Sequence, residues 1–126
     1  MTVARVVAGA LLLAAAGCAS YRAYEGERRP ASEVAVISGE AKFRAATPLA
    51  LVIRAVDGQT VDVRYNSVEL LPGKHSLLVD CQVAGEAATA SRHSVDVEVG
   101  GGERYRLQAD MRPGNRSCER VRLERS

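Results

Sequence analysis

The sequence predicts an all-β protein, a small antiparallel β-sandwich preceded by a signal helix and a flexible tether. Short segments rich in β-branched residues recur from residue 33 onwards, and turn residues separate them at close spacing. No window carries an apolar stripe of helical period with capping residues, so we expect few helices. A chain of 126 residues has the size of one domain, which we place at residues 33–126.

The N-terminal residues 1–17 have the layout of a secretory signal peptide. Arg5 is their only charged residue, and the uninterrupted apolar or small stretch 6–17 follows it. This stretch is shorter than the roughly twenty apolar residues that cross a bilayer core. A basic residue, a short apolar core and small residues in succession are typical of a signal peptide, which export removes.

Cys18 directly follows small residues, with the sequence "AAGC" at 15–18. This arrangement resembles the lipobox of bacterial lipoproteins, although Ala15 stands where that family most often has Leu. The resemblance implies cleavage between Gly17 and Cys18 and a diacylglyceryl group on the Cys18 thiol. Two alternatives stay open: an ordinary signal peptide followed by a chance cysteine, and a cytosolic protein with a buried N-terminal helix.

A lipidated N-terminus and a flexible tether are expected over residues 18–32. The segment is polar and charged, and Gly26 and Pro30 interrupt it, which is linker composition. Fully extended, residues 19–32 would reach roughly 45 Å at ~3.3 Å per residue. Tyr21 and Tyr24 either anchor at the lipid interface or pack back on the domain or stay solvated, and we favour the second interpretation.

The first half of the domain contains three expected strands: "EVAVIS" at 33–38, "LALVIRAV" at 49–56 and "TVDVRY" at 60–65. Asp57-Gly58, between the last two, favours a two-residue type I′ turn. The alternating pattern prefers a loop one residue longer, which pairs Ile53 with Val63. We follow the pattern because it satisfies both faces of the hairpin, and a bulge would reconcile the two.

The next reversal is Pro72-Gly73, which fits the central positions of a type II turn because Gly supplies the positive φ. The segment "HSLLVDCQV" at 75–83 follows as a core strand. One side of this strand carries Leu77, Val79, Cys81 and Val83. We expect the alanine-rich stretch 84–90 to be a loop.

A hairpin over Val95–Leu107 is the best-supported element of the sequence. The three-residue loop Gly100–Gly102 closes it. This register places apolar residues such as Val97 and Tyr105 opposite each other on one face, and acids opposite arginines on the other. Such cross-strand pairs each contribute roughly 0.2–1 kcal/mol.

The chain is expected to end with a reversal at "RPGN", 112–115, and a strand at "ERVRLE", 119–124, facing inward with Val121 and Leu123. Cys118 has the opposite parity to these two residues. If it bonds to a core-facing cysteine, it must therefore lie before the strand or at a bulge.

The chain has three cysteines. With Cys18 acylated, Cys81 and Cys118 remain as a pair, and disulfides persist in an oxidising compartment. Closing a loop of this length would stabilise the fold by about 4 kcal/mol on the chain-entropy model, an upper-end figure. The alternative is two unpaired thiols.

The sequence predicts no catalytic residue, no metal site and no cofactor. His75 and His93 do not form a close ligand pair, and no cysteine cluster supports zinc. The glycines at 100–102 precede a strand, so the helix N-terminus of a phosphate site is missing. Asp96 and Glu98 have arginine partners in the expected hairpin.

The charge balance argues against nucleic acid as a partner. The chain has 17 Lys and Arg residues against 15 Asp and Glu residues, whereas a nucleic-acid footprint needs a strongly basic face. Five arginines gather near the C-terminus: Arg112, Arg116, Arg120, Arg122 and Arg125. They could face anionic lipopolysaccharide or an acidic partner, but a solvated edge kept charged against aggregation explains them as well, and we prefer it.

Three stretches together resemble PEGA-type domains, small β-sandwich modules of bacterial envelope proteins: "VDG" at 56–58, "LLPGKHSLLV" at 70–79 and "VDVEVGGGERYRL" at 95–107. The resemblance covers about residues 49–107 and implies a PEGA/immunoglobulin-like or transthyretin-like sandwich. The stretch "CASYRAYEGERRPASEVAVI" also resembles the start of small uncharacterised proteobacterial lipoproteins. Neither resemblance implies an enzymatic activity.

The expected function is that of a membrane-anchored envelope lipoprotein, a non-catalytic accessory or binding module rather than an enzyme. Its expected partners are the membrane, through the lipid on Cys18, and an envelope protein or anionic envelope polymer. Ala19 and Ser20 follow Cys18, in place of the Asp that resembles an inner-membrane retention signal. We therefore expect the periplasmic face of the outer membrane. The alternative is a small periplasmic enzyme or a metal-dependent envelope factor.

Overall fold

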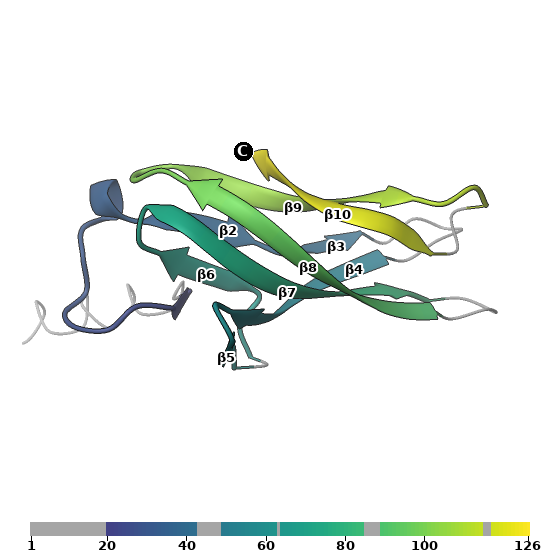
Figure 1. The fold of residues 1–126 in the computed structure, drawn as a ribbon, viewed down its shortest axis with the longest axis horizontal. Coiled ribbons are helices and arrows are strands. Elements are labelled where there is room, and N and C mark those ends of the chain that lie inside the picture. The colour runs from purple at the N-terminus through teal and green to yellow at the C-terminus, as the bar shows by residue number, and fades with distance from the viewer. Residues whose placement is uncertain (1–19, 43–48, 63, 85–88, 115–116) are drawn as a thin grey trace, which may run out of the picture.

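The predicted all-β sandwich is confirmed. The computed structural model describes residues 20–42, 49–62, 64–84, 89–114 and 117–126. Within them, two sheets pack together, and a short 3₁₀ turn lies at Ala31–Glu33 (Figure 1). The expected signal peptide, Gly17 and Cys18 lie outside the described residues. No helix in the described part of the chain is long and apolar enough to span a bilayer.

The strands divide into two sheets of five. Sheet A has the order β1 (Tyr21–Arg22), β6 (Ser67–Leu70), β2 (Ala35–Ser38), β9 (Arg104–Met111) and β10 (Cys118–Arg125). Sheet B has the order β3 (Glu40–Lys42), β4 (Leu49–Val56), β7 (Gly73–Val83) and β8 (Thr89–Val99), with β5 (Gln59–Thr60) paired to β4. All pairings of sheet B are antiparallel, whereas β1 with β6 and β2 with β9 are parallel pairs of sheet A.

The core lies between the sheets and is mainly aliphatic, as a chain without Trp and with a single Phe requires. The alternation expected for 75–83 is confirmed, because every second residue of β7 from Leu77 to Val83 is buried. The largest fully buried side chains are Ile37, Leu51, Ile53, Leu70, Leu77 and Leu107. Burying one such side chain contributes roughly 1.5–3 kcal/mol.

The prediction that Val95–Leu107 forms a hairpin is wrong, because its two strands do not pair with each other. β8 pairs with β7, and β9 pairs with β2 and β10, so the loop Gly100–Gly102 crosses from one sheet to the other. Val97 and Tyr105 are both buried, but they lie in the two facing sheets rather than in one ladder. An alternating pattern specifies which face of a strand is apolar, but it does not determine which strand lies beside it.

The longer loop expected at Asp57-Gly58 is also wrong. Val56 pairs with Gln59 across a two-residue turn, and both turn residues have positive φ, 49° for Asp57 and 82° for Gly58, as a type I′ turn requires. The strand expected at 60–65 ends after Thr60, and Val63 lies outside the described residues. Local turn chemistry therefore prevails over patterning, because β7 is the long partner of β4.

Two segments change sheets at one tight corner. The chain passes from β2 in sheet A to β3 in sheet B through Gly39 alone, and it enters β6 through Asn66. The Gly39 amide donates to the Asn66 carbonyl at 2.8 Å. The Asn66 side chain accepts from the Ile53 amide and donates to the Leu51 carbonyl, both at 3.1 Å. A Cβ at Gly39 would overlap the Leu51 carbonyl and the Asn66 side chain.

Gly39→Ala should therefore lower the free energy of unfolding by about 1–3 kcal/mol, the usual cost of overpacking. Urea denaturation measures this change. Gly100→Ala is the matched control, because a Cβ there would find its nearest neighbour, Glu103 Cγ, at an ordinary 3.5 Å. Equal denaturation midpoints for the two variants would contradict the packing described for this corner.

Candidate functional site

The structure brings together Cys81 and Cys118, the cysteines that the sequence predicts to pair. They are placed as a disulfide, with Cα atoms 6.4 Å apart, inside the range of natural disulfides. Cys81 lies on β7 of sheet B and Cys118 begins β10 of sheet A, so the pair links the two sheets. The pairing of β9 with β10 shifts register between Cys118 and Arg120. Of the two arrangements that the parity of Cys118 allowed, a position before the strand or at a bulge, the register shift corresponds to the second.

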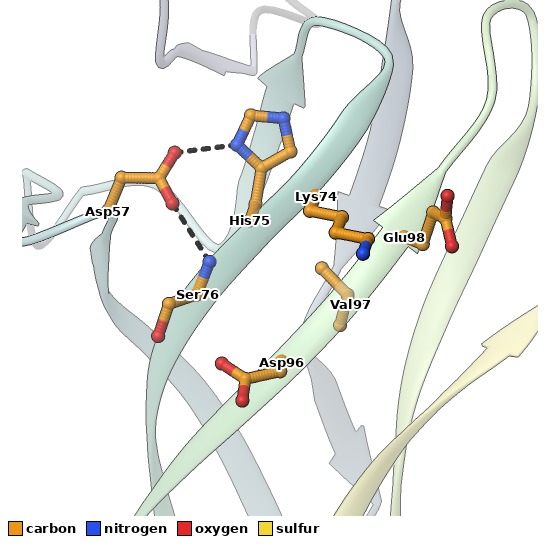
Figure 2. Close-up of a pocket in the computed structure, with 7 residues that line it drawn as sticks. All are labelled: Asp57, Lys74, His75, Ser76, Asp96, Val97 and Glu98. Atoms are coloured by element: carbon orange, nitrogen blue, oxygen red, sulfur yellow. Dashed lines mark hydrogen bonds and ion pairs between the residues drawn. The ribbon is translucent and has the colours of Figure 1, made fainter.

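The structure also pairs Asp57 with His75, a contact that the sequence analysis missed. Asp57 Oδ2 lies 2.6 Å from His75 Nδ1, and Asp57 Oδ1 accepts from the Ser76 amide at 2.8 Å (Figure 2). Both residues border a hollow of about 540 Å³ over the start of β7 and the end of β8. The Asp-Gly turn was visible in the sequence, but its position beside His75 depends on the pairing of β4 with β7.

The Asp57–His75 pair is not arranged as a catalytic dyad. His75 Nε2, the nitrogen that a base would use, lies 2.7 Å from the Leu71 carbonyl oxygen. A carbonyl only accepts, so Nε2 carries a proton, and Nδ1 donates to the carboxylate when the ring is an imidazolium. The Ser76 hydroxyl points away from the ring (Figure 2). The pair instead fastens the β4–β5 turn to β7.

The hydrogen bonds around Asp57 affect its titration. Burial raises the pKa of this carboxyl, but the hydrogen bonds from His75 and the Ser76 amide outweigh it, and the net pKa is lower than usual. A carboxyl with a lowered pKa stabilises the fold at pH values above its unfolded pKa, and the contribution disappears as the pH falls.

His93 does not join this cluster. His93 Nε2 lies 2.8 Å from Ser91 Oγ, and the β7–β8 ladder places His93 opposite Val79, four residues along from the position of His75. That spacing corresponds to about 14 Å at ~3.4 Å per residue. In the part of the chain that the structure describes, no group of three or more His, Cys, Asp or Glu residues is positioned to hold a metal ion.

Three of the five C-terminal arginines form ion pairs within the domain. Asp110 lies 2.6 Å from Arg120 and 3.2 Å from Arg122, and Arg125 lies 3.5 Å from Glu103. The hydrogen bond from Arg120, with that from Arg122, lowers the pKa of Asp110. Arg116 lies outside the described residues. These pairs favour a solvated, charged edge strand over a free anion-binding row.

The first described residues of the segment expected to be a flexible tether, 20–24, instead lie against the sandwich, whereas residues 25–33 are exposed. Ser20 Oγ lies 2.8 Å from Ser67 Oγ, β1 pairs with β6, and the Ala23 amide donates to the Glu69 carbonyl at 3.0 Å. Tyr21 packs against the core and its ring centroid lies 5.9 Å from that of Tyr65. Tyr21 thus packs back on the domain, as one of the two interpretations expected.

The docked segment covers Glu69, a residue that sequence reasoning also missed. Glu69 is 9% exposed, and its Oε2 lies 3.5 Å from the Arg28 guanidinium without a hydrogen bond to it. Residues 20–33 therefore bury an acidic side chain on the outer face of β6.

Comparison of the whole chain with protein-family models, curated proteins and solved structures finds no match.

Acid should destabilise the wild-type chain more than Asp57→Asn. Asn keeps the turn and removes the charge. As the pH falls from about 4, the range in which Asp protonates, the wild type loses the charged hydrogen bonds of Asp57, and the variant has none to lose. Urea midpoints measured between pH 6 and pH 2 test this. Asp96→Asn, on the rim of the same hollow, is the control. Identical slopes for Asp57→Asn and wild type would refute the role of the pair.

Cys81 and Cys118 should resist alkylation in protein that is purified without reductant. Mass spectrometry of the alkylated protein provides the measurement. The bond would close a loop between cysteines that are 37 residues apart in the sequence. Replacing both cysteines by Ala should therefore lower the free energy of unfolding by up to about 4 kcal/mol. Full labelling of both thiols without reductant would remove the disulfide from the account.

Proposed function

We propose that this chain is a bacterial envelope lipoprotein, acylated on Cys18, whose sandwich is a non-catalytic accessory or binding module. The observation that carries the proposal is the "AAGC" sequence at the end of an apolar stretch, directly ahead of a folded all-β module. An acyl chain contributes about 0.8 kcal/mol per buried CH₂, so a diacylglyceryl group supplies a firm anchor. The residues Ala19 and Ser20 favour the outer membrane.

The geometry of the polar side chains supports a binding rather than a catalytic role. The one His–carboxylate pair described, His75 with Asp57, has its remaining nitrogen occupied by a carbonyl. Other acids form ion pairs within the domain. Asp80, for example, pairs with Arg54 and with Arg92, each at 2.8 Å. The hydrogen bond from Arg92 lowers the pKa of Asp80 against the effect of burial.

The edges of the two sheets supply surface for a partner. β8 is the last strand of sheet B, and its 11 residues offer one side of their backbone for an added strand. Its inward residues Val95, Val97 and Val99 are buried, so an added strand would extend a sheet that is already packed. An extended segment of an envelope protein is the partner class that fits this edge.

Cys18→Ser should release the protein from the membrane fraction, because Ser does not accept the lipid. Fractionation of cells tests this, together with the mass of the N-terminal peptide of the wild type. The double variant Cys81→Ser, Cys118→Ser is the control and should remain in the membrane fraction. Unchanged membrane association of Cys18→Ser, or an uncut N-terminus without acyl mass, would refute the anchor.

A further inference from the structure

We propose that the sandwich lies directly against its own membrane through one defined surface, the anchor face, which contacts anionic phospholipid headgroups. The anchor face consists of Tyr21, Arg22, Arg28, Arg64 and Tyr65. The inference rests on the proposed acylation of Cys18 and deepens it, because it assigns the orientation of the anchored domain.

The first argument is the length of the link between lipid and fold. Only Ala19 separates Cys18 from Ser20, and Ser20 already contacts Ser67 of β6. Two residues span at most about 7 Å. A lipid on Cys18 therefore leaves the chain beside β1, and the domain has no long tether on which to move away from the bilayer.

The second argument is the chemistry that surrounds this point. Ser20, Asp62 and the anchor face line one hollow of about 410 Å³. Tyr21 and Tyr65 stack at a tilt, half-buried, and the Tyr21 hydroxyl donates to the Thr60 carbonyl at 3.5 Å. The Tyr21 ring packs on the core while its hydroxyl stays at the surface, and tyrosines with one apolar and one polar side are enriched at the level of lipid headgroups. All three arginines beside them, Arg22, Arg28 and Arg64, are exposed.

The third argument is charge. The three arginines of the anchor face outnumber the acids that contact them: Arg64 pairs with Asp62 at 2.9 Å and Arg28 with Glu69 at 3.5 Å. The Arg22 guanidinium lies 5.7 Å from the centre of the Tyr24 ring, and no acid of the described residues forms an ion pair with it. Guanidinium groups bind phosphate in a planar, bidentate manner, so headgroup phosphates are suitable ligands for this surface.

The position of the anchor face in the fold sets the orientation. β1 and β10 lie at opposite edges of the five strands of sheet A, roughly 19 Å apart at ~4.8 Å per strand. In Figure 1, β1 and β5 lie along the lower side of the molecule and β9 and β10 along the upper side. With the anchor face on the membrane, β10 and its arginines point away from the bilayer.

Variants with a single introduced Trp test this orientation. The chain itself contains no Trp, so all Trp fluorescence comes from the introduced position. The acylated protein is reconstituted in phosphatidylethanolamine–phosphatidylglycerol vesicles that contain a dansyl-headgroup lipid, and energy transfer from Trp is measured. Thr60→Trp reports next to the anchor face, and Glu119→Trp on β10 is the matched distal position. Transfer from Thr60→Trp should exceed that from Glu119→Trp at least about twofold, given the ~19 Å between the sheet edges.

Two further variants test the headgroup contact itself. Arg22→Gln with Arg64→Gln should bring the two transfer efficiencies closer together, whereas Arg120→Gln with Arg122→Gln at the opposite edge should not change them. Equal transfer from both Trp positions, or an unchanged ratio in the Arg22, Arg64 variant, overturns the inference. If the protein does not float with the vesicles and its N-terminus lacks acyl mass, the anchor fails as well. Flotation with equal transfer overturns the orientation alone.

Discussion

The exclusion of water from a thin aliphatic layer between the two sheets is the constraint on which the rest of this structure depends. Val, Leu and Ile side chains dominate that layer, because the chain has no Trp and one Phe. Small side chains fill it only if the sheets approach closely, and the segments that change sheets must then be compact. Gly39 is one such corner, and Gly101 is another, where a Cβ would lie 2.9 Å from the Ser32 carbonyl. The pair Cys81 and Cys118 spans the same layer.

The N-terminal segment belongs to this packing rather than to a linker. Tyr21 and Ala23 pack on the core, and β1 covers the edge of β6 that sheet A would otherwise leave open. Covering an edge removes a site for strand-to-strand aggregation. The segment would also link folding stability to membrane attachment, because the residues that follow the proposed anchor are the ones that complete sheet A. With the proposed anchor beside β1, the far edges β8 and β10 are the strands that would be left for a partner.

The sequence predicted faces well and neighbours poorly. Burial along β7 and β10 follows the expected alternation, and the register shift beside Cys118 is one of the two arrangements that its parity allowed. The partner of β8 was mistaken because alternating strands on either side of a glycine loop suit both a hairpin and a crossing between sheets. The composition of residues 18–32 indicated a linker, whereas β1 within this segment pairs with β6 through its backbone, which composition does not reveal. The Asp57–His75 contact depends on tertiary structure in the same way.

Docking of the N-terminal segment is the central claim, and amide hydrogen exchange of Ala23 in the mature acylated protein tests it most directly. The Ala23 amide donates to the Glu69 carbonyl at 3.0 Å, as the Val36 amide in β2 donates to the Glu103 carbonyl at 3.1 Å. Protection of Ala23 comparable with that of Val36 is the expected result. Exchange of Ala23 at the rate of an unstructured peptide, with Val36 still protected, would return the segment to a free tether and contradict the account.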